Sequence, residues 1–250
     1  MSRPKLYIFA ISHYCEKARW ALDYLGIGHE VHYLPPGPHR MTAKRLGARR
    51  SSLPILVADG QTVQGSAAIV DWADARASTE SRCLTPDDGR EECLQIEKRL
   101  DRVAGVHTRR YYYSEAMVDH PRMVRPIFTR DLSWPQKLLV RGTWGVVRKL
   151  MIQGMDLGAE QGQESRRIVE GELEWLDGLL SDGRRFLVGG QFSRADIAAA
   201  SLFAPLAAPK QHPTYASLQL PPNLAADLVG WQERPSVNWV REVYDQYRLT

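Results

Sequence analysis

Apolar and polar positions at the start of the chain follow two different periods, which predicts a strand followed by a helix. The apolar run 6–10 is typical of a buried strand. After it, apolar residues recur at i, i+4, i+7, i+8 and i+11, which is one face of a helix; they are Tyr14, Ala18, Ala21, Leu22 and Leu25. Ser12 is a preferred N-cap residue, and Gly26 stands where a helix commonly ends. The pattern therefore predicts strand, short loop and helix.

The segments up to residue 73 continue this alternation of strands and helices. Residues 29–34 alternate loosely before a proline-rich segment and predict a second strand, whereas the basic stretch 38–52 predicts an irregular or partly helical connection. Residues 53–57 and 61–64 flank the turn Asp59-Gly60, which indicates a β-hairpin. A helix capped by Ser66 follows.

The second half of the chain has helical periodicity throughout. Residues 78–90 are polar and predict a linker. Helices are expected from residue 91 with breaks near Pro121 and Pro126, over 135–155, along the stripe that includes Val169 and Leu173, and from Pro235 to Tyr247. The expected organisation is an α/β domain over 1–77, a linker over 78–90 and an all-α domain over 91–250.

Composition places the chain among ordinary globular proteins. Hydrophobic residues make up 44% and charged residues 25%. No apolar run approaches the roughly 18 residues of a membrane span, and polar residues interrupt the N-terminus before a signal peptide could form. These features predict a cytoplasmic protein with no membrane partner.

Charge and cysteine content exclude further classes. The net charge is +4, and the paired arginines are scattered without any nucleic-acid-binding motif. An anionic small ligand is therefore expected rather than a nucleic acid. The three cysteines contain no C-x-x-C, so neither a disulfide framework nor a metal site is expected.

The start of the first predicted helix carries the candidate chemistry. Ser12 and Cys15 have an S-x-x-C spacing at the positive end of that helix, where backbone N–H groups favour a negative charge such as a thiolate. Two plainer interpretations stay open: Ser12 as a simple cap, and Cys15 as a small buried residue.

With these features, the first 77 residues resemble the glutathione-binding domain of cytosolic glutathione transferases. The resemblance implies a thioredoxin-like fold, with Ser12 in the place of the residue that holds the glutathione thiol in the serine-type classes. It also implies a cis bond between Leu53 and Pro54, with the backbone before the proline bonding the peptide part of glutathione. Ser66 corresponds to the family serine that holds the γ-glutamyl carboxylate.

The resemblance extends further but has one departure. The capping box Ser193-x-x-Asp196 is similar to that of a core helix in the family's C-terminal domain. Gly65 stands where the family usually has Glu, Asp or Gln, and Gln64 is not expected to replace that side chain, because neighbouring strand residues point to opposite faces. Tyr14 is a further candidate for binding glutathione, and Arg45, Arg49 and Arg50 are candidates for its glycyl carboxylate.

The resulting hypothesis is a glutathione transferase in which Ser12 activates glutathione, the co-substrate, for attack on a hydrophobic electrophile, in a homodimer without a metal. Lowering a thiol pKa from about 8.5 to about 6.5 requires about 2.7 kcal/mol, which a hydrogen bond to the charged sulfur can supply. The family's alternative phenol is disfavoured, because Ile8 holds its position and Tyr7 faces the other way.

Two alternatives from other classes stay open. One is a thiol oxidoreductase or peroxidase that works through Cys15. The other is a non-catalytic protein of this fold that binds hydrophobic ligands. In the family, the first long helix lines the electrophile pocket, and here that helix carries the triplet 111–113 of tyrosines, of which one or two can face a pocket; an ordinary packing role for them stays open as well.

Overall fold

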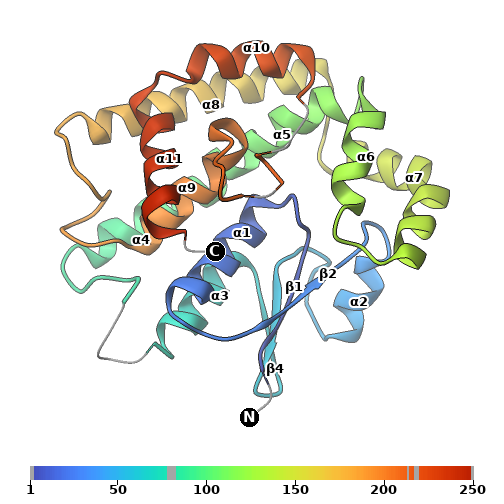
Figure 1. Ribbon diagram of the computed structural model, residues 1–250, viewed down its shortest axis with the longest axis horizontal. Coiled ribbons are helices and arrows are strands. Elements are labelled where there is room, and N and C mark those ends of the chain that lie inside the picture. Colours follow the sequence, from blue (N-terminus) through green and yellow to red (C-terminus); the bar gives the residue numbers. More distant parts are fainter. Residues whose placement is uncertain (1–2, 78–82, 213, 217–219, 249–250) are drawn as a thin grey trace. The chain divides into compact units, whose positions relative to one another are not determined.

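The computed structural model describes residues 3–77, 83–212, 214–216 and 220–248. The chain divides into two compact units (Figure 1). The first contains Met1–Leu84 together with Arg125–Val147, and the second contains Thr85–Val124 with Arg148–Thr250.

The first unit is built on a four-stranded sheet with the order β2-β1-β3-β4. Its strands are β1 (Lys5–Ile8), β2 (Glu30–Tyr33), β3 (Ile55–Ala58) and β4 (Gln61–Gln64). β1 is parallel to β2 and antiparallel to β3, and β3 and β4 form the predicted hairpin. With helices α1 (His13–Tyr24), α2 (His39–Arg45) and α3 (Ser66–Asp74), this is the expected thioredoxin-like arrangement.

The core of this unit follows the two periods of the sequence. Leu6 and Ile8 alternate into the core from β1, and Leu56 and Ala58 do so from β3. α1 and α3 cover them with apolar side chains at helical spacing, which are Cys15, Ala18, Leu22, Ile69, Trp72 and Ala73. α1 ends as predicted, because Gly26 has φ +69° and its N–H bonds the carbonyl of Asp23.

Residues 125–147 belong to the first unit, although their helical pattern assigns them by sequence to the helical domain. They run from α6 (Pro121–Thr129) into α7 (Trp134–Gly154). The Phe128 ring packs edge-on against Phe9, with centroids 6.3 Å apart. The break expected near Pro121 is confirmed, because a new helix begins at this residue, but the break expected near Pro126 is wrong, because that residue lies inside α6.

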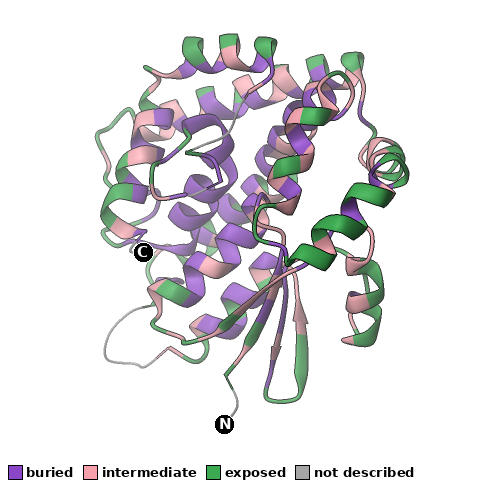
Figure 2. Ribbon diagram, turned by 45° about the vertical axis from the view of Figure 1, so that its right-hand side comes forward, coloured by how far each residue is buried: buried purple, intermediate pink, exposed green. Residues whose placement is uncertain are grey.

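The second unit is helical, and its described residues contain no strand. The helices are α4 (Arg90–Arg99), a π-helical turn η1 (Leu100–Ala104), α5 (Gly105–Ala116), α8 (Ala159–Leu180), α9 (Arg194–Ala207), α10 (Pro222–Trp231) and α11 (Pro235–Tyr247). α9 is buried along its whole length (Figure 2). The predicted capping box starts it, since Asp196 accepts hydrogen bonds from the backbone N–H and the hydroxyl of Ser193.

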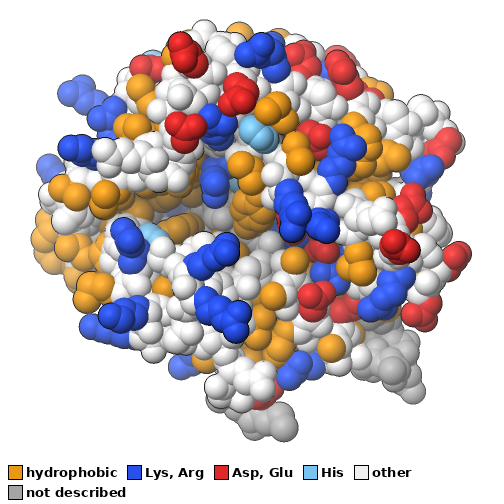
Figure 3. Space-filling model, turned by 180° about the vertical axis from the view of Figure 1, so that it is seen from behind, with side chains coloured by type: hydrophobic (Ala, Val, Ile, Leu, Met, Phe, Trp, Pro, Cys, Tyr) orange, Lys and Arg blue, Asp and Glu red, His pale blue; other side chains and the backbone are white. Residues whose placement is uncertain are grey.

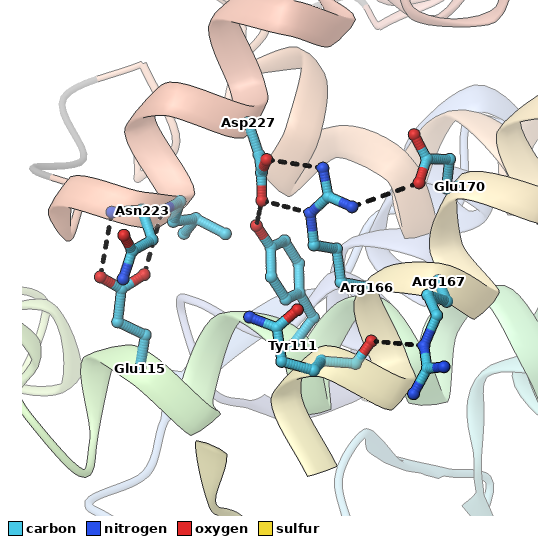
Figure 4. A network of polar contacts seen from close by, with 9 residues as sticks. Tyr111, Glu115, Arg166, Arg167, Glu170, Asn223 and Asp227 are labelled. Carbon is cyan, nitrogen blue, oxygen red and sulfur yellow. Dashed lines mark hydrogen bonds and ion pairs between the residues drawn. The ribbon is translucent and has the colours of Figure 1, made fainter. Parts of the chain in front are cut away.

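A network of polar contacts fixes α10, which the sequence pattern did not predict (Figure 4). The Tyr111 hydroxyl donates to the Asp227 carboxylate, which also accepts two hydrogen bonds from Arg166. The Glu115 carboxylate accepts from the backbone N–H groups of Asn223 and Leu224 at the start of α10. The Tyr111 side chain is therefore occupied in holding this unit together.

Candidate functional site

The predicted glutathione-binding residues of the first unit lie at one edge of its sheet. β1 ends at Ile8, next to Tyr7, whose partner is Ile55, the first residue of the antiparallel strand β3. Ile55 in turn pairs with Gln64, the last residue of β4. The end of β1, the start of β3 and the end of β4 therefore lie at the same end of the sheet. The segments that adjoin them, which are the start of α1, the residue before β3 and the start of α3, begin or end there as well.

Ser12 is the N-cap of α1, as predicted. It has extended backbone angles, and its Oγ accepts a hydrogen bond from the Cys15 N–H at 3.4 Å. Its N–H bonds the carbonyl of Phe9, so the chain turns directly from β1 into the helix. The accepted bond uses a lone pair of the hydroxyl, whose proton can be donated, and the residue is half-buried. This hydroxyl can stabilise a negative charge at the helix N-terminus.

Cys15 does not fit the role of a thiolate. Its side chain is 1% exposed and packs in the core. Burial raises the pKa of the Cys15 thiol to about 12, and this effect exceeds the lowering by the neighbouring Ser12 hydroxyl. The position at the helix N-terminus is therefore not enough, because desolvation keeps this thiol protonated at neutral pH.

The Leu53–Pro54 bond is cis, which confirms the expectation from the sequence. The Pro54 carbonyl accepts the Gly65 N–H at 3.0 Å, so the turn into α3 lies against the proline. Within the described part of the chain, the backbone N–H and carbonyl of Leu53 have no hydrogen-bond partner. They are suited to bonding an extended peptide.

Ser66 is the first residue of α3, whereas the expected serine cap is wrong: Gly65 is the N-cap and offers no side-chain hydrogen bond. Gly65 has φ +98°, a conformation that favours glycine over the Glu, Asp or Gln typical of the family. Ser66 is buried, and its position places a hydroxyl beside the N–H groups of the first turn of α3. This is the chemistry of a carboxylate site.

Gln64 does not take over the role of the missing side chain. Its Oε1 accepts from the Arg50 N–H at 3.0 Å, and its Nε2 donates to the carbonyls of Arg50 and Ser52 at 2.6 and 2.8 Å. Both Nε2 donors and one lone pair of Oε1 are thus directed at the loop that leads to Leu53.

The other predicted residues are less closely connected. Arg49 is exposed and, among the described residues, makes no ion pair or side-chain hydrogen bond. The Tyr14 ring is half-buried against His13, with centroids 4.6 Å apart. Tyr7 stacks on His32 while Ile8 enters the core, so these two neighbours face opposite ways, as the alternation predicted.

The structure adds a small pocket that sequence reasoning missed. It lies beside the start of α1 and is lined by Phe9, Ala10, Tyr33, Leu34, Phe128, Asp131 and Leu132. His39 packs edge-on against Phe9, and its Nδ1 accepts the Gly37 N–H. Burial, followed by the nearby Arg40, lowers the His39 pKa to about 4, so this imidazole is neutral. No local pattern could join residues 128–132 to Phe9.

Two further observations concern a buried lysine of this unit and possible metal ligands in the described chain. Lys17 is fully buried in α1, which is rare for a lysine and which its sequence context did not signal. In the part of the chain that the structure describes, no three His, Cys, Asp or Glu side chains are grouped so that they could hold a metal ion.

Comparison with known families identifies both parts of the chain. Residues 6–81 match the N-terminal domain of glutathione S-transferases, and residues 159–226 match the C-terminal domain. Together these matches cover more than half of the sequence, so the chain belongs to the glutathione S-transferase superfamily. No curated protein matches the sequence.

Solved structures support the same fold at low identity. The β-etherase LigF from Sphingobium sp. strain SYK-6 has a TM-score of 0.61 at 20% identity, covering 96% of this chain and 99% of that one. Glutathione transferase GSTFuA3 from Phanerochaete chrysosporium has a TM-score of 0.66 at 14% identity, covering 100% and 99%. A glutathione S-transferase from Ceriporiopsis subvermispora, solved in complex with glutathione, has a TM-score of 0.62 at 14% identity with the same coverage. At such identities the likeness shows the fold alone.

Proposed function

We propose that the protein is a glutathione transferase in which Ser12 stabilises the glutathione thiolate for attack on a hydrophobic electrophile. The observation that carries this proposal is the half-buried Ser12 hydroxyl at the N-terminus of α1, with a proton to donate. The family membership and the glutathione complex of a related structure support glutathione as the thiol.

Glutathione would lie along the sheet edge. The unpaired backbone groups of Leu53 bond its cysteinyl residue, and the first turn of α3 at Ser66 binds its γ-glutamyl carboxylate. Arg49 is the candidate for the glycyl carboxylate, and Tyr14 borders the thiol site. Because Gly65 carries no side chain, the γ-glutamyl group has one contact fewer than is usual in the family.

The chemical step is a nucleophilic substitution or addition at carbon. The thiol gives up its proton to water, and the Ser12 hydroxyl donates a hydrogen bond to the resulting thiolate. The sulfur then forms a bond to the electrophilic carbon, and a leaving group such as chloride departs with its bonding electrons. The aromatic residues Phe9, Tyr33 and Phe128, which line the small pocket near the start of α1, offer an apolar surface to the electrophile.

The alternative through Cys15 is weakened by its burial, because a protonated, inaccessible thiol is a poor nucleophile. Gly65 still supports the non-catalytic alternative, because the missing side chain removes one contact to glutathione. A homodimer and a cytoplasmic location are part of the same proposal, and both rest on the family resemblance and the composition.

The test compares Ser12→Ala with Ser12→Thr and Cys15→Ala in the conjugation of glutathione to a chlorinated nitrobenzene. In Ser12→Ala the thiol pKa should return to about 8.5, so kcat/KM at neutral pH should fall at least about tenfold and recover as the pH is raised. Ser12→Thr keeps both the hydroxyl and the helix cap and should retain most activity. Cys15→Ala should change the rate little.

Two other results would favour the alternative functions. Loss of activity in Cys15→Ala with normal Ser12→Ala would assign the reaction to the thiol oxidoreductase class. A lack of glutathione binding by calorimetry in the unmodified chain would favour the non-catalytic protein.

A further inference from the structure

The outer face of helix α7 is apolar although it is exposed to solvent. Trp134, Leu138 and Val146 are 74%, 55% and 66% exposed. They are four and eight residues apart, so at roughly 100° per residue they lie along one side of the helix. The opposite side is formed by the buried residues Val140, Trp144 and Val147, which belong to the first unit. Singly exposed apolar residues are ordinary, but a stripe of them on one helix marks an interaction surface.

The charge of α7 has a single sign. Residues 134–154 contain four basic residues and no acidic one. Lys137 and Arg141 are exposed and lie at one edge of the stripe, because each follows a stripe residue by three positions: Lys137 follows Trp134, and Arg141 follows Leu138. In Figure 3, orange and blue side chains lie side by side along the edge that carries this helix.

The neighbouring helix α2 also combines exposed basic residues with an exposed apolar residue. The loop before it reaches α7, because a Cβ at Gly37 would lie 3.0 Å from the Val147 side chain. α2 presents exposed basic residues and Met41, which is 61% exposed, and it has no acidic residue.

We propose that the outer face of α7, defined by Trp134, Leu138 and Val146 with Lys137 and Arg141, binds the surface of anionic lipid bilayers. A basic amphipathic helix lies in the plane of the interface, with its apolar side chains at the acyl boundary and its cations near the headgroups. An exposed tryptophan at a helix end is typical of the interfacial region. Among the described residues, no helix is long and apolar enough to cross the bilayer, so the contact is peripheral.

Charge complementarity selects the bilayer over a second copy of the chain. A two-fold contact through this face would bring two sets of Lys137 and Arg141 together, and α7 has no carboxylate to neutralise them. An anionic surface, in contrast, is complementary to the exposed Lys137 and Arg141. This inference is independent of the proposed enzymatic activity, and it differs from the expectation of no membrane partner, which rested only on the missing membrane span.

The experiment is sedimentation of the full chain with phosphatidylcholine vesicles prepared with and without phosphatidylserine. The chain should sediment only with the anionic vesicles, and less so as the salt concentration rises. The double variant Lys137→Ala/Arg141→Ala should bind about 25-fold more weakly, from about fivefold for each charge. Its matched control is Lys98→Ala/Arg102→Ala, which removes two exposed basic residues from the second unit and should bind normally.

Apolar contact is tested separately. Leu138→Glu should abolish binding, whereas Val229→Glu, at a residue of α10 that is 74% exposed, should not. Circular dichroism of each variant shows that the helices are retained. The proposal is overturned by equal sedimentation with neutral vesicles, by no sedimentation at all, or by equal losses in the controls. It is also overturned if Leu138→Glu only abolishes self-association, or if polyglutamate binds as tightly as the vesicles.

Discussion

The side-chain amide of Gln64 is bonded to the backbone of Arg50 in both directions. Oε1 accepts from the Arg50 N–H at 3.0 Å, and Nε2 donates to the Arg50 carbonyl at 2.6 Å. A residue at the end of β4 thereby holds the loop that leads to Leu53. The glutamine next to Gly65 therefore holds the backbone of the loop that leads to the proposed glutathione site.

Replacing Gln64 should loosen this loop. Gln64→Ala removes three hydrogen bonds, so we expect the affinity for glutathione to fall about fivefold, with little change in kcat. Calorimetry and steady-state kinetics measure the two effects. Gln61→Ala is the matched control, since it removes the same kind of side chain from an exposed position of β4. Equal effects of the two variants would contradict the role of Gln64.

Gly65 offers a test of the missing γ-glutamyl contact. There is open space around its Cβ position, but φ +98° strains any other residue, so Gly65→Gln should cost about 1–2 kcal/mol of the free energy of unfolding. Its amide should nevertheless raise the affinity for glutathione about threefold to tenfold. Gly65→Ala carries the same strain without the amide and should lose stability without gaining affinity. Urea denaturation and calorimetry distinguish these outcomes, and a similar affinity in both variants would contradict the prediction.

Loss of the hydroxyl should change the free energy of unfolding differently at two neighbouring tyrosines. Tyr111 donates to the Asp227 carboxylate, whereas the buried Tyr112 hydroxyl has no partner among the residues described. Tyr111→Phe should therefore lower the free energy of unfolding by about 1.5–3 kcal/mol. Tyr112→Phe should leave it unchanged within about 0.5 kcal/mol, or raise it. Urea denaturation of both variants is the measurement, and the reverse order would show that the network does not stabilise the unit.

The same network predicts a dependence on pH. The hydrogen bonds from Arg166, and then from Tyr111, hold the pKa of Asp227 below its usual value. A carboxyl whose pKa is lower in the folded state stabilises the protein above its unfolded pKa of about 4, and this contribution is lost as the pH falls through the folded value. The difference in unfolding free energy between the unmodified chain and Asp227→Asn should thus be full at neutral pH and shrink below about pH 4. A difference that does not vary with pH would contradict this account.

The sequence by itself determined the order of elements and the local starts of helices. Alternating and helical periods predicted the strands, the hairpin and the helices α1, α3, α8 and α11, because burial of one face imposes a period on the chain. The caps at Ser12 and Ser193 depend on contacts within three residues, so the local sequence is sufficient to predict them.

Tertiary structure decided what depends on distant residues. Cys15 lies in the first turn of α1, where the helix end favours a thiolate, but the sheet and α3 bury it, and desolvation outweighs the helix end. Only folding brought Phe128 against Phe9, and only the turn at Gly65 showed why a glycine stands there. Tertiary structure also decided which face of α7 is exposed. A helical pattern alone does not say which face the core will cover, and in the folded chain the core covers Val140, Trp144 and Val147.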